Sequence, residues 1–170
     1  LYMVQNFSET QFETPPYRGG LSQLMLGDGK GDFKALTASQ SGLIVPTDGR
    51  GLARTDINGD GFPDFVIAVN DGELKAFTSV ADGPRPKKIT LRGSKGNPMA
   101  AGSKILFQST ENKGRIRVEE IYQGGGYLSQ SGNAHYIDSS FDSLIIYWPN
   151  GKKTEHSLPC LLYTSDAADE

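Results

Sequence analysis

The stretch Asp56-Ile57-Asn58-Gly59-Asp60-Gly61-Phe62-Pro63-Asp64 decides how this chain is expected to fold. Three oxygen-bearing side chains recur at alternate positions, and a fourth, that of Asp64, closes the series. The two glycines between them allow the chain to turn tightly enough for these oxygens to converge. A hard cation such as Ca²⁺ takes six to eight oxygen ligands at about 2.3–2.6 Å. The sequence therefore predicts a Ca²⁺ site made by Asp56, Asn58, Asp60 and Asp64, with the backbone carbonyl of Phe62 as a fifth ligand.

The segments on either side of this loop indicate strands and not helices. An EF-hand would need a bidentate Glu at its twelfth position, which is Ile67 here, and a helix on each side. Residues 65–69 are apolar and partly β-branched, which predicts a buried strand, and residues 51–55 are its expected partner. A Ca²⁺ loop between two strands is the resulting interpretation. The alternative is an Asp- and Gly-rich turn that binds no metal.

The composition favours an all-β protein. The 170 residues include 21 Gly and 9 Pro, which separate short apolar runs. No run of about 18 apolar residues is present, so no membrane span is expected. The single cysteine, Cys160, excludes an internal disulfide framework.

The charge distribution indicates two domains. Residues 1–84 carry a net charge of −5, residues 85–159 a net charge of +5, and the remaining residues −3. The change of sign predicts a boundary near residue 84. The basic part has no clustered Lys and Arg stripe with stacking aromatics, so nucleic acid is not an expected partner.

An internal repeat suggests that the first segment is built from similar units. Residues 1–6 align with residues 65–70, at an offset of 64 residues. If the repeat holds, Leu1 follows a preceding loop of the same kind, and the chain is a fragment that begins inside a repeat. A long polar loop is expected over residues 7–20.

Two stretches carry a resemblance to the FG-GAP or VCBS repeat, the blade of integrin-like β-propellers. The first is the loop of residues 56–64 between its strands, and the second is Gly27-Asp28-Gly29-Lys30-Gly31 followed by Phe33. The resemblance implies that residues 1–84 form about one blade and part of another. It also implies that the remaining blades of the full-length chain are partners of this segment.

The second segment resembles the ASPIC/UnbV domain, which accompanies VCBS or FG-GAP repeats in secreted bacterial proteins and in the cartilage acidic protein family. The marks that carry this resemblance occur in the same order as in the family: Gly96-Asn97-Pro98 with Gly102, then residues 126–131, then Trp148-Pro149-Asn150-Gly151. Residues 135–139 depart from the family pattern at a tight turn. The resemblance implies a small β-sandwich-like domain over residues 85–159, and Asn150-Gly151 predicts a hairpin at its end.

The last residues, 160–170, resemble the translation of a sequencing adapter and are expected to be an artefactual tail. A natural acidic tail is the alternative. If the tail is artefactual, Cys160 carries no redox information.

Candidate catalytic residues are few. His135 and His156 lack the strand–Gly-x-Ser-x-Gly–helix elbow that would activate a serine. Glu119 and Glu120 are adjacent, so in a strand they point to opposite faces and cannot act as a pair. Trp148 is expected to pack against a neighbouring strand, although stacking on a sugar ring is the alternative.

Together these observations predict an all-β chain that comprises a partial β-propeller and an ASPIC/UnbV domain. The expected function is that of a non-enzymatic, secreted or cell-surface Ca²⁺-binding module that adheres to an extracellular protein or glycan ligand. The alternative is the scaffold part of a secreted enzyme that acts on polysaccharides, with an active site outside this chain.

Overall fold

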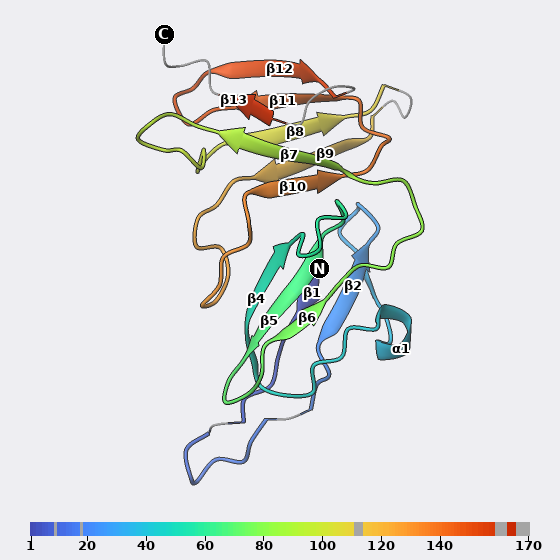
Figure 1. The fold of residues 1–170 in the computed structure, drawn as a ribbon, viewed down its shortest axis with the longest axis vertical. Helices are drawn as coiled ribbons and strands as arrows, with labels where there is room; N and C mark the ends of the chain where they lie inside the picture. The colour runs from blue at the N-terminus through green and yellow to red at the C-terminus, as the bar shows by residue number, and fades with distance from the viewer. Residues whose placement is uncertain (9, 18, 111–113, 159–162, 166–170) are drawn as a thin grey trace. The chain divides into compact units, whose positions relative to one another are not determined.

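The computed structural model describes residues 1–170 except residues 9, 18, 111–113, 159–162 and 166–170, and of residues 163–165 it describes only the backbone. Within this described part the regular secondary structure is nearly all strand, which confirms the all-β expectation (Figure 1). The exception is α1 (Ala38–Ser41), a single turn that the sequence did not lead us to expect. No helix among the described residues is long and apolar enough to cross a membrane. The chain forms two compact units, which are described separately below.

Unit 1 comprises Leu1–Ile57, Asp64–Ser79 and Gly124–Ser131. One of its two sheets is an antiparallel meander of β4 (Gly49–Thr55), β5 (Asp64–Val69) and β6 (Lys75–Phe77). The expected pair of strands around the Asp-rich loop is therefore present, in a register that pairs Thr55 with Asp64. A register shift between Gly49 and Gly51 leaves Arg50 in a β-bulge, a feature that re-aims a side chain.

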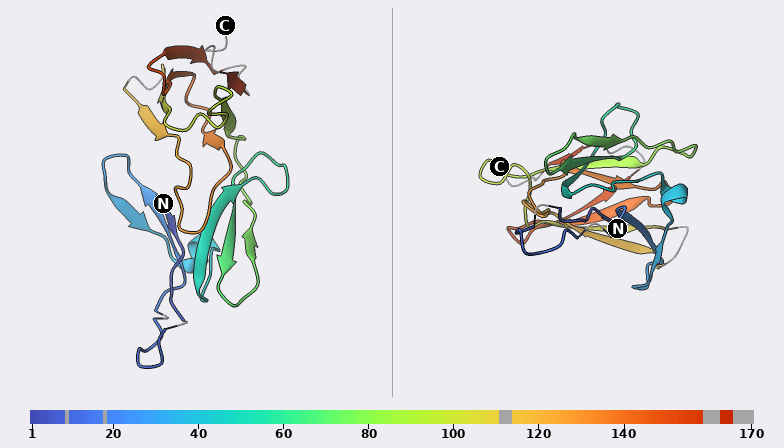
Figure 2. Two further views of the ribbon diagram at one scale, coloured as in Figure 1. Left: turned by 90° about the vertical axis from the view of Figure 1, so that its left-hand side faces the viewer. Right: turned by 90° about the horizontal axis from the view of Figure 1, so that it is seen from below.

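The second sheet of unit 1 contains β1 (Tyr2–Met3), β2 (Gln23–Gly27) and β3 (Phe33–Ala35), also antiparallel. In Figure 2 this sheet, drawn in blue, stands apart from the teal and green sheet of β4–β6. The two sheets share a core because Tyr2 of β1 lies 5.0 Å from Phe65 of β5, measured between ring centroids. Its buried members are Tyr2, Leu43, Val45 and Ile67.

Two irregular segments complete unit 1. The expected long loop after β1 is drawn out into a hairpin, closed where Phe7 and Tyr17 form an isolated antiparallel bridge. The glycine-rich residues Gly124–Ser131, which sequence patterns grouped with the second domain, pack with unit 1. Their anchor is Ser131, whose hydroxyl oxygen accepts a hydrogen bond from the backbone N–H of Arg54 in β4 at 3.1 Å.

Unit 2 comprises Asn58–Pro63, Val80–Gln123 and Gly132–Glu170. One sheet has the order β12–β11–β8–β9, and all its neighbouring strands are antiparallel. Its strands are β8 (Lys104–Gln108), β9 (Ile116–Glu120), β11 (Ser143–Tyr147) and β12 (Lys153–Ser157). The other sheet has the order β10–β7–β13, with strands β7 (Lys87–Arg92), β10 (Ala134–Ile137) and β13 (Tyr163–Ser165). In this second sheet β10 is antiparallel and β13 parallel to β7.

One hydrophobic core joins the two sheets of unit 2. Strands β7 and β8 alternate buried and more exposed residues, as strands with one covered face do. The buried residues come from both sheets and from the turns between them: Ile89, Leu91, Ala100, Ile105, Phe107, Ile121, Ile137, Phe141, Leu144, Ile146, Trp148 and Leu158. Both sheets therefore place apolar residues in a single cluster.

The expected hairpin at Asn150-Gly151 is present between β11 and β12. Gly151 has a φ of 84°, a left-handed conformation that glycine adopts without a steric penalty. Trp148 is buried, and its indole N–H donates to the hydroxyl of Thr154 at 2.9 Å, so this side chain packs as predicted and offers no face to a sugar. The expected artefactual tail over residues 160–170, with Cys160, lies outside the described residues apart from the backbone of β13.

Candidate functional site

The Asp-rich loop connects β4 to β5, so it lies where the sequence predicted a turn between two strands. Gly59 and Gly61 have φ values of 75° and 88°, in the left-handed region that favours glycine. An alanine at position 59 would meet no other atom within 4 Å, so the requirement for glycine there is set by the backbone conformation. The two glycines therefore act as predicted, by allowing tight local turns.

Asp64 anchors the loop at its closing end. Its side chain is fully buried, and each carboxylate oxygen accepts a backbone hydrogen bond of 2.8 Å. One donor is the N–H of Ile57 at the start of the loop, and the other is the N–H of Ser79 beyond β6. A buried carboxylate requires such donors because burial of an unpaired charge is costly. Asp64 thus fixes the loop start and the segment after β6 on one side chain.

Asn58, Asp60 and Phe62 form a second group of contacts in the loop. The Asp60 carboxylate accepts a hydrogen bond from the Phe62 N–H at 2.8 Å and another from the Asn58 amide at 2.8 Å. The Asn58 amide oxygen accepts in turn from the Asp60 N–H at 3.1 Å. The hydrogen bond from Phe62, then that from Asn58 and the charge of Arg85, hold the pKa of Asp60 below its ordinary value. An aspartate is already ionised at neutral pH, and these contacts keep Asp60 ionised to a lower pH than usual.

The predicted ligands do not all belong to one unit. Asp56 and Asp64 belong to unit 1, whereas Asn58, Asp60 and Phe62 belong to unit 2. Asp56 is half-buried. Among the residues that the structure describes, no group of three or more His, Cys, Asp or Glu side chains gathers in a way that could hold a metal ion. Asp64 contacts backbone donors of unit 1, and Asn58, Asp60 and Phe62 contact one another in unit 2.

The donor chemistry of the loop nonetheless fits a hard cation. Its side chains offer carboxylate and amide oxygens, with no nitrogen or sulfur ligand that would favour a softer metal. The predicted ligands therefore remain the side chains of Asp56, Asn58, Asp60 and Asp64 and the carbonyl of Phe62. The chemistry of the ion there would be charge neutralisation and not catalysis.

Sequence reasoning missed a buried ionic group in unit 1, centred on Asp48. This residue is 3% exposed and forms an ion pair with Arg50, with 2.7 Å between Nε and Oδ1. Its Oδ2 accepts hydrogen bonds from the Ser8 N–H at 3.1 Å and the Arg50 guanidinium at 2.9 Å, with the Asn70 amide at 3.4 Å. Burial opposes ionisation of Asp48, but the hydrogen bonds from Ser8 and Asn70 and the charge of Arg50 outweigh it and lower the pKa. The sequence feature that could have indicated this pair is an acid and a base two residues apart beside a strand, because residues at this spacing lie on the same face.

In unit 2 the two adjacent glutamates have separate partners. Glu119 contacts the side chains of Arg117 and His135, whereas Glu120 pairs with Lys104 at 2.8 Å on the neighbouring strand β8. They point to opposite faces, as expected for neighbours in a strand. His135 is mostly buried and lies in β10, so its contact with Glu119 links the edges of the two sheets.

The Gly96-Asn97-Pro98 segment of unit 2 is a closely packed turn. The Asn97 side-chain amide forms two hydrogen bonds with the backbone of Ala101. It donates to the carbonyl at 2.8 Å and accepts from the N–H at 2.9 Å. A Cβ atom on Gly93 would lie 2.1 Å from the Asn97 carbonyl oxygen, so only glycine fits there. Gly102 is left-handed, with a φ of 83°, and an added Cβ would lie 3.7 Å from Pro149. Gly93 is therefore required by close packing and Gly102 by its backbone conformation, whereas an added Cβ at Gly96 would meet nothing within 4 Å.

This turn and the Trp148 hairpin lie within the segment that a comparison with known families identifies. Residues 93–159 match the family model described as ASPIC and UnbV. This part of the chain is therefore similar to ASPIC/UnbV domains. A search of curated proteins found no match to the chain. The family match thus covers the motifs from Gly96 to Gly151 on which the resemblance was based.

Proposed function

We propose that the chain is a Ca²⁺-stabilised, extracellular or cell-surface ligand-binding module. In this proposal residues 1–84 are an FG-GAP or VCBS segment, about one propeller blade and part of another, and residues 85–159 are the ASPIC/UnbV domain in a β-sandwich-like form. The module is non-enzymatic and binds a protein or a glycan.

The observation that carries the proposal is the loop between β4 and β5. It combines a buried anchoring carboxylate, Asp64, with a second carboxylate, Asp60, whose pKa is lowered by local hydrogen bonds. Two left-handed glycines, Gly59 and Gly61, bring the polar residues into tight turns. An antiparallel pair of strands with such an oxygen-rich connection is the arrangement that the FG-GAP resemblance implies.

The role of Ca²⁺ in this proposal is to stabilise the corner between the two strands. Asp56, Asp60 and Asp64 are three negative charges within nine residues, and their mutual repulsion opposes a compact loop. A divalent cation offsets that repulsion. Because the ion binds the folded loop and not the unfolded chain, it stabilises the fold by mass action. Extracellular modules with dissociation constants of about 10⁻⁴–10⁻³ M are kept occupied by extracellular Ca²⁺.

Thermal unfolding of the intact chain with excess Ca²⁺ and with EDTA tests the proposal. The chain is expected to unfold at a higher temperature with Ca²⁺, and the Asp60→Ala variant at the same temperature in both conditions. Asp28→Ala is a matched control, because the Asp28 carboxylate also accepts two backbone hydrogen bonds in a hairpin turn of unit 1, from Lys30 at 2.7 Å and Asp32 at 3.1 Å. The control is expected to keep the response to Ca²⁺. A response that survives in Asp60→Ala would refute the proposed site.

The ligand-binding part of the proposal has a separate test. The intact chain, labelled and loaded with Ca²⁺, is applied to arrays of extracellular matrix proteins and glycans. Saturable binding to at least one of them is expected. Absence of binding on both arrays would contradict the adhesion role while leaving the Ca²⁺ result unaffected.

A further inference from the structure

We propose that a pocket at the base of the residue 7–17 hairpin in unit 1 binds a neutral saccharide. The inference deepens the proposed ligand-binding function but does not rest on the Ca²⁺ loop. The pocket is a shallow surface depression, open to solvent, with a volume of about 490 Å³. It is lined by Gln5, Asn6, Phe7, Tyr17, Gly19 and Gly20.

Two aromatic rings lie on one face of the hairpin. Phe7 and Tyr17 exchange both backbone hydrogen bonds, each 2.8 Å long, so they are directly opposite each other. Directly opposed residues of an antiparallel pair project their side chains to the same side. Phe7 is 39% exposed and Tyr17 is 64% exposed, although both line the pocket. The pocket therefore has two aromatic walls that the described residues of unit 1 leave partly exposed.

The Phe7 ring is held in place by Arg50. The guanidinium of Arg50 lies 4.3 Å from the ring centroid, an attractive cation–π distance. Arg50 is itself fixed by its ion pair with buried Asp48, and Asp48 also accepts the N–H of Ser8, the residue next to Phe7. The charge of Arg50 is thus already neutralised by Asp48. The aromatic wall is preorganised, which lowers the entropic cost of binding.

The floor of the pocket is polar and rigid. The Asn6 side-chain amide donates to the Gly20 carbonyl at 2.8 Å and accepts from the Gly20 N–H at 3.0 Å. Gln5 occupies the space that a side chain at position 20 would need, because an added Cβ there would lie 1.8 Å from Gln5 Nε2. Glycine at position 20 therefore makes room for the Gln5 amide.

The Gln5 amide and the Tyr17 hydroxyl have no hydrogen-bond partner among the described residues. An amide offers a carbonyl acceptor and two N–H donors, and a phenol offers one donor and one acceptor. Sugar hydroxyls, which both donate and accept, match this pair of groups. These two side chains provide the orienting polar contacts that a small-molecule pocket needs.

The lining selects the class of ligand. Among the described residues, none of the six that line the pocket carries a charge, so these six offer no ion pair to an anionic or cationic ligand. Aromatic faces are electron-rich and attract the partly positive C–H groups on the face of a pyranose ring. A neutral saccharide supplies such a face and a rim of hydroxyls, which corresponds to the two walls and the polar floor.

The experiment is an NMR titration of the intact, isotope-labelled chain that follows the side-chain amide of Gln5. The probes are cellohexaose, maltohexaose, laminarihexaose, xylohexaose and mannohexaose at millimolar concentration, with an oligogalacturonate and adenosine as comparators. At least one neutral oligosaccharide is expected to shift the Gln5 amide resonances in a saturable way. Tyr17→Ala is expected to weaken that binding roughly tenfold, the loss typical when an aromatic platform under a stacked ring is removed.

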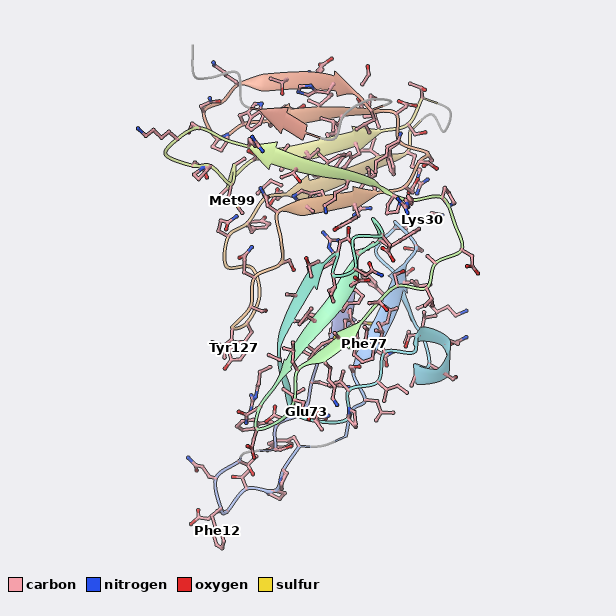
Figure 3. The ribbon with its side chains drawn as sticks, viewed as in Figure 1. Phe12, Lys30, Glu73, Phe77, Met99 and Tyr127 are labelled. Atoms are coloured by element: carbon pink, nitrogen blue, oxygen red, sulfur yellow. The ribbon has the colours of Figure 1, made fainter. Side chains whose placement is uncertain are left out.

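Two variants with matched controls separate this site from a general effect on folding. Phe12→Ala removes an exposed aromatic ring at the tip of the same hairpin, outside the pocket, and is expected to bind normally (Figure 3). Gly20→Ala keeps every polar group but displaces the Gln5 amide, so it is expected to weaken binding. Gly83→Ala, where an added Cβ meets nothing within 4 Å, is expected not to weaken it.

Three results would overturn the inference. The first is that no neutral oligosaccharide shifts the Gln5 amide, and the second is that only the oligogalacturonate or adenosine does. The third is that Phe12→Ala weakens binding as much as Tyr17→Ala. The titration is repeated in EDTA and with Asp60→Ala, and saccharide affinity is expected to be the same in both. Failure of the Ca²⁺ site and failure of the saccharide site are therefore distinguishable.

Discussion

Removal of the Asp64 carboxylate is expected to destabilise the corner between β4 and β5 even without metal. In Asp64→Ala the backbone N–H groups of Ile57 and Ser79 each lose a buried, charged acceptor at 2.8 Å. A hydrogen bond to a charged group contributes about 1.5–3 kcal/mol, so the loss of two is expected to cost about 3–6 kcal/mol. This is a large fraction of the stability of about 5–15 kcal/mol that is usual for a domain.

Native-state hydrogen exchange in EDTA measures this cost at the two donors. The amides of Ile57 and Ser79 are expected to lose protection by a hundredfold or more, because each factor of ten corresponds to about 1.4 kcal/mol. Asp28→Ala is the control, since it also removes two backbone hydrogen bonds, but from an exposed carboxylate that water can replace. If Asp64→Ala does not fold, Asp64→Asn keeps one acceptor oxygen and is expected to show a smaller loss at one of the two amides. Unchanged protection in a folded Asp64 variant would refute the anchoring role.

Three further predictions concern unit stability. The pKa of Asp48 is lowered in the fold, so ionised Asp48 contributes to the free energy of unfolding above its ordinary pKa of 3.8, and this contribution is lost as pH falls below that value. Asp48→Asn is therefore expected to make the stability of unit 1 depend less on pH in that acid range. Phe107 is fully buried in the core of unit 2, and Phe107→Ala is expected to cost about 3–5 kcal/mol in urea unfolding. Gly59 has a φ of 75° and open space around it, so Gly59→Ala is expected to cost about 1–2 kcal/mol of backbone strain, measured by exchange of the loop amides.

Each of these has a matched control. Asp142→Asn, in unit 2, is expected to leave the acid unfolding of unit 1 unchanged. Val118→Ala, on a strand next to Phe107 but half-exposed, is expected to cost much less than Phe107→Ala. Gly83→Ala lacks a left-handed φ and is expected to be neutral. A cost for Gly59→Ala no greater than that for Gly83→Ala would contradict the strain argument.

The parts of the fold that local patterns specify were predictable. The apolar residues 65–69 and the polar loop before them predicted β5 and its partner β4, since strand periodicity and turn chemistry agree there. The Asn150-Gly151 turn predicted the β11–β12 hairpin in the same way. The glycine and proline motifs around Gly96 led to the ASPIC/UnbV resemblance that the family comparison supports.

The parts that depend on distant contacts were not predictable. Asp48 receives hydrogen bonds from Ser8 and Asn70, which are 40 and 22 residues away, and no local pattern encodes that convergence. The glycine-rich residues Gly124–Ser131 lie within the segment that matches the family model, and their packing with unit 1 is encoded by no local pattern. For Asp64, sequence spacing suggested a metal ligand, while its two backbone hydrogen bonds became visible only in three dimensions.

The most direct test of the account is a calorimetric Ca²⁺ titration of the intact chain, after circular dichroism has shown that the chain is folded. The account predicts one Ca²⁺ per chain with a dissociation constant of about 10⁻⁴–10⁻³ M, the range of extracellular modules. Binding is expected to be lost in Asp60→Ala and retained in Asp28→Ala. A folded chain that binds no Ca²⁺, or that binds it equally well in Asp60→Ala, would contradict the central claim and reduce the Asp-rich loop to a turn.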